Sequence, residues 1–527
     1  MNDESGSEVS RVRSNSFGRF LGVLWLGLRS RPGLFAAVCV VVVAAGFYGE
    51  EDWRGARAWK RYQAEAAARG LSLDYATYIP KPVPDEENFA ATPYLKTFLN
   101  PSPGVLAQDL YSQAADHVYQ YYPKKEQGRR HFTDLVAWQQ AAVALEAGAL
   151  GNNQRFGTNK SDLASRAAAA PAVLEGLKPN AEVFAQLRKD SGRKYSRFPI
   201  NYNTENPTLT QLPHLSYLKQ TCQRLELQAC AELAVGQSDA ALADVKLILA
   251  LADSVKTEPV LISFLVRISC VQVAIQPVWE GLAEHGWSDA QLQEIQARFA
   301  SYDFLSGMDE ALKAERAYGN VLCDLLKKKG FGAMFDFGTG GSQAPQINIF
   351  NAIGSILPSG WFDMEKLNYN KAFDELMRGT IDTVARRVSP RATAEEALFF
   401  DMRMPTPHVI LQHRFAASLL LANIGRMPLK AAVPQVEADQ VALACALERY
   451  RLAEGRFPET LEALAPRFMG QVPNDVITGQ PYKYRLTADG RYVLYSVGWN
   501  GKDDGGVPGE SLFDREKGDW VWEYPGL

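Results

Sequence analysis

Apolar residues follow three different patterns along the chain, and each pattern predicts a different kind of structure. Residues 34–48 form an apolar run without a charged side chain. From about residue 53 to residue 430 the apolar positions recur at helical spacing. Beyond residue 480 two short segments alternate apolar and polar residues, which is typical of strands with one buried face. We therefore expect a mainly α-helical protein with an N-terminal transmembrane helix, a body of helical hairpins and a small α+β module at the C-terminus.

The apolar run at 34–48 predicts a membrane anchor. A helix needs roughly 20 residues to cross a hydrocarbon layer about 30 Å thick. The run is short for this, but its flanking residues and the interfacial Tyr48 and Trp53 extend it. We therefore predict a transmembrane anchor at 32–49. A cleaved signal peptide is the alternative, because small residues near Gly46 offer a cleavage site.

Charges on the two sides of the anchor predict its orientation. Arginines precede the apolar run and acids follow it: Arg11, Arg13, Arg19, Arg29 and Arg31 before, and Glu50, Glu51 and Asp52 after. Basic flanking residues stay on the cytoplasmic side of a membrane. We expect residues 1–31 to form a basic cytoplasmic tail and the bulk of the chain to be extracytoplasmic. The protein is then a single-pass protein of the inner or cytoplasmic membrane.

The segment 50–430 is expected to form one extracytoplasmic helical domain. Residues 225–259 have the pattern of a helical hairpin, with small residues where two antiparallel helices approach each other. The stretch 260–279 is apolar enough to suggest a second membrane span, but Arg267 lies near its middle. A central arginine costs roughly 2.5–3.5 kcal/mol on insertion scales. We therefore predict that this stretch is a helix buried in the core of the domain.

The segment 431–527 is expected to form a separate α+β module. Residues 442–450 repeat apolar side chains at helical spacing. The stretches YKYRL (482–486) and RYVLYSV (491–497) alternate with a period of two on either side of a TADG turn. This pattern predicts a helix that packs on a small antiparallel sheet.

Composition and charge narrow the range of partners. The chain of 527 residues has 46% hydrophobic and 22% charged residues and a net charge of −4, so nucleic acid is not an expected partner. The six cysteines stand far apart without a CxxC motif, which argues against a zinc site and against a dense disulfide framework. We expect single buried thiols. A disulfide between Cys222 and Cys230 is the alternative that an oxidising compartment would permit.

A search for catalytic motifs finds none in the sequence. The six histidines include no HExxH, no GxSxG occurs, and the glycine-rich stretch 330–345 lacks the pattern of a phosphate-binding or dinucleotide-binding loop. A site assembled from distant residues stays open, such as His117 with the carboxylates of residues 85–87. The simpler interpretation of these acids is an N-cap and a first helical turn. We therefore expect a binding protein rather than an enzyme.

Four segments near the C-terminus carry a resemblance to a known family. In order, they are a helix that ends in Tyr450, Gly455 and Pro458, a turn and strand from Asp475 to Tyr484, the strand end YSVG at 495–498, and an acidic loop that closes on Asp514, Gly518 and Trp520. Together they resemble the globular domain of the major pseudopilins of type II secretion systems. The resemblance covers only the segment 431–527, and the rest of the chain matches no family.

The resemblance implies a calcium ion in the acidic loop. Carried over position by position, it assigns Asp503, Asp504 and Asp514 as ligands, with Asn500 and Glu510 as weaker candidates. Calcium takes roughly six to eight oxygen ligands and accepts carboxylates, amides and carbonyls from a flexible loop. The loop does not have the EF-hand pattern. The alternative is a solvated acidic turn that binds no metal.

The N-terminus does not have the pilin pattern, in which a glutamate is the fifth residue after a glycine cleavage site. Val38 occupies that position after Gly33, and cleavage after Gly46 would place Glu51 there but would already have removed the apolar run, so we expect a pseudopilin-like module on another body and no polymerisation.

We expect a membrane-anchored extracytoplasmic binding or scaffolding protein that contacts other envelope proteins. The alternatives are an envelope enzyme with a site in the helical body and an accessory component of a secretion system. A deep polar pocket in the body would favour the enzyme, and a broad exposed apolar groove would favour the scaffold.

We predict that a reporter active only outside the cytoplasm is active when it is fused at residue 60, because the arginines hold the preceding residues in the cytoplasm. The measurement is reporter activity after cell fractionation, with a fusion at residue 15 as the cytoplasmic control. Activity of the residue 60 fusion with a cytoplasmic reporter alone would contradict the orientation. A soluble fragment that begins near Tyr48 would indicate cleavage instead.

Overall fold

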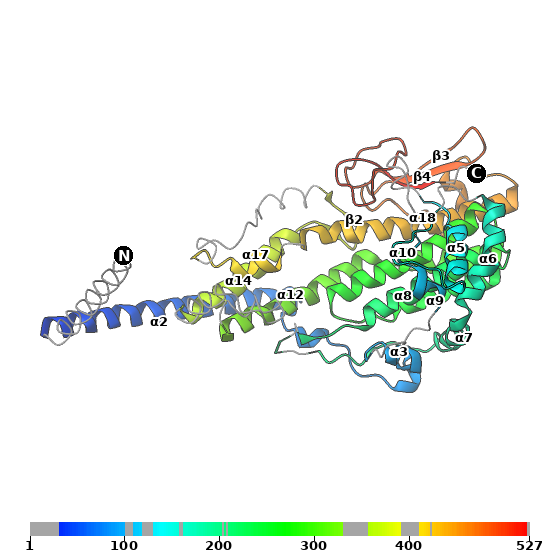
Figure 1. Ribbon diagram of the computed structural model, residues 1–527. Helices are drawn as coiled ribbons and strands as arrows, with labels where there is room; N and C mark the ends of the chain where they lie inside the picture. Colours follow the sequence, from blue (N-terminus) through cyan, green and yellow to red (C-terminus); the bar gives the residue numbers. More distant parts are fainter. Residues whose placement is uncertain are drawn as a thin grey trace, which may run out of the picture. The chain divides into compact units, whose positions relative to one another are not determined.

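The fold is seen in a computed structural model, which describes residues 31–100, 109–118, 130–157, 162–202, 205–206, 209–329, 357–390, 411–421 and 424–523 (Figure 1). Residues 1–30 of the expected cytoplasmic tail and the glycine-rich stretch 330–345 lie outside the described residues. The described chain is mainly helical, as the sequence predicts. It divides into two compact units: residues 1–70, 323–369 and 407–416 form unit 1, and residues 71–322, 370–406 and 417–527 form unit 2.

The longer helices account for most of the described residues. In chain order they are α2 (Arg31–Ala68), α5 (Leu135–Glu146), α6 (Leu163–Leu177), α7 (Ala181–Asp190), α8 (His214–Ala234), α9 (Ser238–Asp253), α10 (Leu261–Ala283), α11 (Asp289–Ala300), α12 (Phe304–Lys329), α14 (Ser359–Met377) and α18 (Met427–Glu454). Short helices are α3 (Pro93–Thr97), α4 (Leu110–Ala114) and α17 (Phe415–Leu420). The strands are β1 (Ile381–Asp382), β2 (Arg387–Val388), β3 (Lys483–Leu486), β4 (Tyr492–Ser496) and β5 (Trp520–Glu523).

The first part of α2 is a candidate membrane span. The helix has 38 residues, which corresponds to about 57 Å at a rise of about 1.5 Å per residue. The most apolar 18-residue stretch of the helix is 0% buried within the protein. Phe35, Val40 and Val43 are among its exposed side chains. The structure therefore confirms an N-terminal apolar helix that is long enough to cross a membrane.

The second part of α2 belongs to the core of unit 1, where it crosses the start of α14. The crossing is so close that a Cβ on Gly55 would lie 2.2 Å from the carbonyl oxygen of Gly360. At the same place Asp52 accepts a hydrogen bond from the backbone N–H of Gly360 at 2.7 Å, and Glu51 accepts one from the Trp361 indole at 3.0 Å. These acids, which the sequence offers as orientation signals, also fix the first turn of a second helix.

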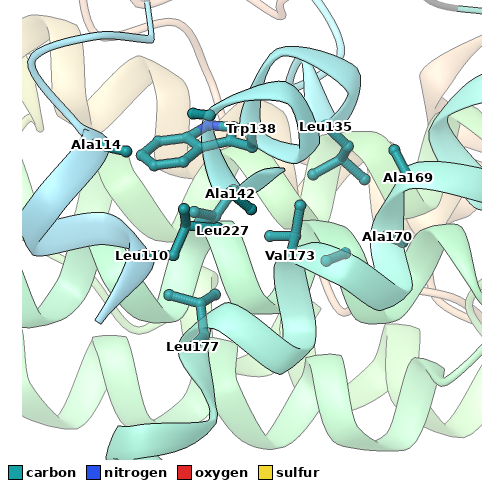
Figure 2. Packing of buried hydrophobic residues seen from close by; sticks show 12 residues of the cluster. Leu110, Ala114, Leu135, Trp138, Ala142, Ala169, Ala170, Val173, Leu177 and Leu227 are labelled. Atoms are coloured by element: carbon teal, nitrogen blue, oxygen red, sulfur yellow. The ribbon is translucent and has the colours of Figure 1, made fainter. Parts of the chain in front are cut away.

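A bundle of helices forms the core of unit 2. Helices α8 and α9 form the hairpin that the sequence predicts between residues 225 and 259, and α10 packs on both. Helices α5 and α6 pack on each other and against α8 through a cluster of alanine, leucine and valine side chains around Trp138 (Figure 2). Aspartates begin both helices, because Asp134 and Asp162 each accept a hydrogen bond from a backbone N–H of the first turn.

Helix α10 confirms the prediction of a buried core helix at 260–279. The helix is long and apolar enough to cross a membrane, but 61% of its most apolar 18-residue stretch is buried inside the protein. Its central Arg267 is 5% exposed, and it pairs with Asp253 at the end of α9 at 2.8 Å. A buried guanidinium with a carboxylate partner is typical of a folded core and costly in lipid.

The C-terminal segment combines the predicted helix with a three-stranded antiparallel sheet in the order β3-β4-β5. The two predicted strands pair around the TADG turn, with Lys483 opposite Tyr495 and Leu486 opposite Tyr492. Strand β5 adds to the free edge of β4, with Ser496 opposite Trp520.

The compact units do not follow the predicted boundary at residue 430. Helix α18 begins at Met427, and its side chains from 431 to 448 are all buried. It packs against α10 and α11 on one side and contacts β4 and β5 on another. The C-terminal segment and the helical bundle thus share one core, so both belong to unit 2.

Candidate functional site

A cavity of about 630 Å³ lies in unit 2 between the bundle and the C-terminal sheet. Small-molecule sites in proteins typically occupy about 300–1,000 Å³. Its walls are formed by α4, α5, the segment 130–133, α8, α10, α18 and the C-terminal segment, together with Val118. The lining residues are Tyr111, Val118, Arg130, His131, Thr133, Trp138, Gln223, Glu226, Leu227, Gln272, Gln276, Glu437, Gln440, Leu512 and Val521.

An aromatic wall is built by α4 and α5. The rings of Tyr111 and Trp138 stack with centroids 5.6 Å apart. Asp109 begins α4 in a capping box, and it also accepts a hydrogen bond from Arg224 on α8 at 2.9 Å. This buried pair fixes the short helix, and with it Tyr111, to the bundle.

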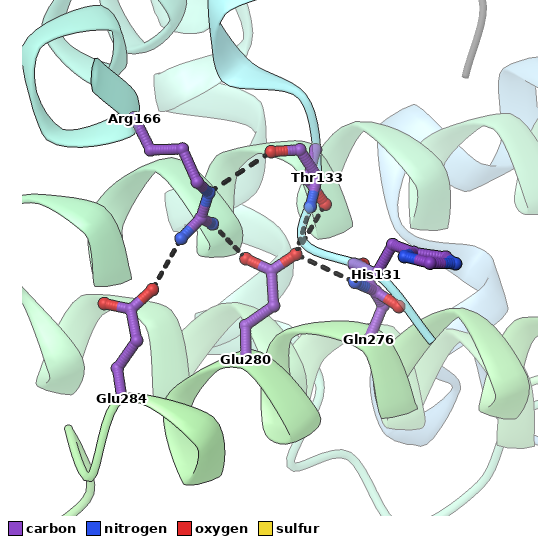
Figure 3. A network of polar contacts seen from close by, with 6 residues as sticks. All are labelled: His131, Thr133, Arg166, Gln276, Glu280 and Glu284. Atoms are coloured by element: carbon purple, nitrogen blue, oxygen red, sulfur yellow. Dashed lines mark hydrogen bonds and ion pairs between the residues drawn. The ribbon is translucent and has the colours of Figure 1, made fainter. Parts of the chain in front are cut away.

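The segment 130–133 is held by a buried ion pair between Arg166 of α6 and Glu280 of α10 (Figure 3). The two side chains are 1% and 0% exposed. Glu280 also accepts hydrogen bonds from the backbone N–H and the hydroxyl of Thr133, both at 2.7 Å. Arg166 donates in turn to the Thr133 carbonyl at 3.3 Å and pairs with Glu284 at 2.5 Å. One carboxylate therefore joins two helices to the extended segment that carries cavity residues.

A second ion pair crosses the cavity wall. Arg130 pairs with Glu437 of α18 at 2.5 Å, and its guanidinium lies 5.7 Å from the ring centre of Trp522. Gln272 of α10 donates to the other oxygen of Glu437 at 2.6 Å. Both oxygens of Glu437 are thus engaged, and the pair ties the start of the segment to α18.

Glu226 of α8 is the one lining carboxyl that no described residue bonds. Burial raises the pKa of Glu226 to about 8, and the nearby charge of Glu280 adds to this shift, while Arg130 opposes it. A carboxyl group with such a pKa carries a proton near neutral pH. The cavity therefore contains a partly buried acid without a partner.

The structure keeps the three predicted calcium ligands in separate hydrogen bonds. Asp503 accepts from Tyr495 at 3.0 Å and pairs with Lys483 at 3.3 Å. Asp504 accepts from the N–H of Gly518, and Asp514 accepts from backbone N–H groups of its own turn. Among the described residues no group of three or more acidic, cysteine or histidine side chains is arranged to hold a metal. The calcium site stays a prediction.

The distant catalytic pair considered from the sequence has separate partners in the structure. His117 contacts the carbonyl of Gln154 at 3.0 Å, whereas Asp85 pairs with Lys96 at 2.7 Å on an exposed turn. The six cysteines are all free, and Cys222 has the thiol of Cys270 rather than that of Cys230 as its close neighbour.

Sequence reasoning missed every residue of the cavity. Glu226, Arg166 and Glu280 belong to no motif, and Arg166 and Glu280, which pair with each other, lie 114 positions apart in the sequence. The available signal was a charge within an apolar or alanine-rich helix, because a buried charge requires a partner or a ligand.

Comparisons with known proteins identify no relative: no family model, no curated protein and no solved structure matches the chain. The cavity therefore has to be interpreted from its own chemistry.

We predict that Arg166→Met destabilises the protein by about 3–5 kcal/mol, because it leaves the Glu280 carboxylate buried without its cation. Lys178→Met is the matched control. It removes a cation just after the same helix from an ion pair that is 67% and 70% exposed, and such pairs contribute at most about 1 kcal/mol. The measurement is chemical unfolding of the purified variants. Equal effects of the two substitutions would contradict the structural role of the Arg166–Glu280 pair.

Proposed function

We propose that the protein is a membrane-anchored, extracytoplasmic receptor that binds a small polar molecule in the cavity of unit 2. The observation that carries the proposal is the cavity itself, with its stacked aromatic wall, two carboxyl groups and four glutamine amides. Binding sites for small molecules combine apolar walls with a few placed polar groups in this way. The exposed apolar part of α2 and the charges that flank it support the anchor and its orientation.

A scaffolding role has less support from the surface. Among the described residues of unit 2, the exposed large apolar side chains are spread over many parts of the chain: Val143, Leu163, Tyr195, Leu209, Ile262, Val384, Leu419, Leu452, Val507 and Phe513. Single apolar residues of this kind are normal on soluble surfaces, whereas a docking surface requires a contiguous patch. The continuous exposed apolar surface of the described chain is the first part of α2, which we assign to contact with lipid.

An envelope enzyme is the second candidate, because the polar pocket is the feature that favours it. Glu226 would be its general acid, since the proton that it keeps near neutral pH is what such a role requires. Glu437, the other carboxyl group that lines the cavity, is poorly suited to act as a base, because Arg130 and Gln272 each bond to one of its oxygens. Binding without turnover therefore accounts better for the arrangement.

The C-terminal segment has a part in the proposed receptor. Its residues Leu512 and Val521 form one wall of the cavity, and Gln440 of α18 donates to the Trp520 carbonyl at 2.7 Å. We propose that its resemblance to pseudopilin domains reflects a shared helix-and-sheet arrangement, used here to close a binding site. Contacts with other envelope proteins and a place in a secretion system are further proposals that a receptor role would accommodate.

We predict that at least one compound in a panel of small polar solutes raises the melting temperature of the full-length protein in detergent. A ligand at a hundredfold excess over its Kd adds about 2.7 kcal/mol to the stability of the folded state. Gln223→Trp should abolish the shift, because Gln223 lines the cavity and indole fills it. Gln220→Trp is the control, since Gln220 lies on the exposed side of the same helix.

Absence of any shift across the panel would contradict the proposed function, as would a shift that persists in Gln223→Trp. Formation of a product from the stabilising compound would favour the enzyme over the receptor.

A further inference from the structure

We propose that the ligand of the cavity is an organic cation with a primary ammonium or guanidinium group, and that Glu226 is its counter-ion. The proposal rests on the proposed function and specifies its ligand class. Three features of the cavity lead to it: the balance of charge, the orientation of the amides and the position of Glu226, which no described residue bonds, beside an aromatic wall.

The first feature is a surplus of negative charge. The two ion-pair networks and Glu226 together contain four carboxyl groups, of Glu226, Glu280, Glu284 and Glu437, but only the two guanidinium groups of Arg130 and Arg166. Buried carboxylates without a compensating cation are strongly disfavoured. In the empty cavity a proton on Glu226 reduces the surplus. A cationic ligand would replace that proton.

The second feature is that three lining amides, those of Gln272, Gln276 and Gln440, donate to acceptors of the protein and keep their carbonyl oxygens as acceptors. Gln276 donates to the His131 carbonyl at 2.7 Å and to Glu280 at 2.8 Å. Gln272 donates to Glu437, and Gln440 donates to a backbone carbonyl. Because every one of these partners is an acceptor, the orientation of each amide is fixed.

The carbonyl oxygens of these amides accept no hydrogen bond from the described residues. They are therefore available to a ligand rich in N–H donors. An ammonium group has three donors and no acceptor, and a guanidinium group has five, so both match such a lining.

The third feature is the position of Glu226 beside an aromatic wall. Glu226 and Tyr111 line the same cavity, and burial together with the charge of Glu226 raises the pKa of Tyr111 to about 12. Aromatic faces attract cations within about 6 Å. Arg224 already takes this place over Tyr111, with its guanidinium 4.9 Å from the ring centre, so the stacked rings of Tyr111 and Trp138 suit the alkyl part of the ligand rather than its charge.

The titratable and charged groups around Glu226 come from every neighbouring element. They are Tyr111 of α4, Arg130 and His131 of the segment 130–133, Cys222 and Cys230 of α8, Glu280 of α10 and Glu437 of α18. Arg130 is the one cation among them that opposes the shift of Glu226, and it is already paired with Glu437. None of these residues therefore supplies a further cation that could pair with Glu226.

Binding of the cation must release the proton of Glu226, which makes affinity depend on pH. The ionised fraction of a carboxyl group with a pKa of about 8 is about 0.1 at pH 7 and about 0.9 at pH 9. The affinity for a cation that remains charged at pH 9 should therefore rise about tenfold between these two values.

The experiment compares matched cationic and neutral probes with the full-length protein in detergent. The probes are butylamine with butan-1-ol, and butane-1,4-diamine with butane-1,4-diol. Calorimetric titration in buffers of different ionisation enthalpy measures both the affinity and the number of protons released. We expect the amines to bind more tightly than the alcohols, with release of about 0.9 proton at pH 7 and about 0.1 at pH 9.

Glu226→Gln should weaken amine binding at least tenfold at pH 9 and remove the proton release, while it preserves the size of the side chain. Glu365→Gln is the matched control, because burial also raises the pKa of Glu365 to about 8 but this residue belongs to unit 1 and does not line the cavity. A merely structural role of Glu226 would change stability without any change in proton release.

Two results would overturn the inference: failure of both amines to bind at pH 9, or amine binding without proton release at pH 7. Binding of the alcohols in place of the amines would refute the cationic ligand but leave the proposed receptor intact. Loss of all small-molecule binding, including the stabilising compounds of the wider panel, would refute the receptor itself.

Discussion

The buried pair of Arg166 and Glu280 is the interaction on which the site depends. A guanidinium and a carboxylate that are both almost fully buried are stable only with complete hydrogen bonding. Here the remaining bonds of Glu280 go to Thr133 and Gln276, and those of Arg166 go to Glu284 and the Thr133 carbonyl. The electrostatic requirement of one pair thereby positions an extended segment that the bundle alone would not hold.

Placement of that segment creates the cavity and its imbalance of charge. Arg130 and His131 reach the cavity because Thr133 is fixed behind them, and Arg130 then pairs with Glu437 on α18. Glu226 is left without a cation. The same low-dielectric surroundings that strengthen the two ion pairs also raise the pKa of this carboxyl group, so the folded protein keeps a proton that a suitable ligand would displace.

Local patterns in the sequence predict the helices and the hairpin but not the cavity. Three elements depend on residues close together in the sequence: the hairpin of α8 and α9, the buried α10, and the pairing of β3 with β4. Periodicity predicted the hairpin and the strands, and the central Arg267 indicated that α10 is a core helix. Arg166 and Glu280 lie 114 positions apart, and Arg130 and Glu437 lie 307 apart. No local pattern records such pairings.

The predicted module boundary illustrates the same limit. Helix α18 is apolar around most of its circumference between residues 431 and 447, which is typical of a helix buried on all sides. We predicted a boundary at residue 430 from the resemblance of the segment 431–527 to pseudopilin domains. The burial of α18 places this segment in the core of unit 2. Only the tertiary structure shows that its other face packs on α10 and α11.

The most direct measurement of the central claim is the pH dependence of stability in wild type and Glu226→Gln. The folded state raises the pKa of Glu226 from 4.5 to about 8, so it binds more protons than the unfolded state between these values. Stability of the wild type must then fall relative to Glu226→Gln as the pH rises from 5 through 8, by up to about 1.4 kcal/mol per pH unit, and the difference must level off above about pH 9. The other raised carboxyl groups are common to both proteins and cancel in the comparison. Urea unfolding curves that give the same stability difference at pH 5 and pH 8 would contradict a protonated, partnerless Glu226 in the cavity.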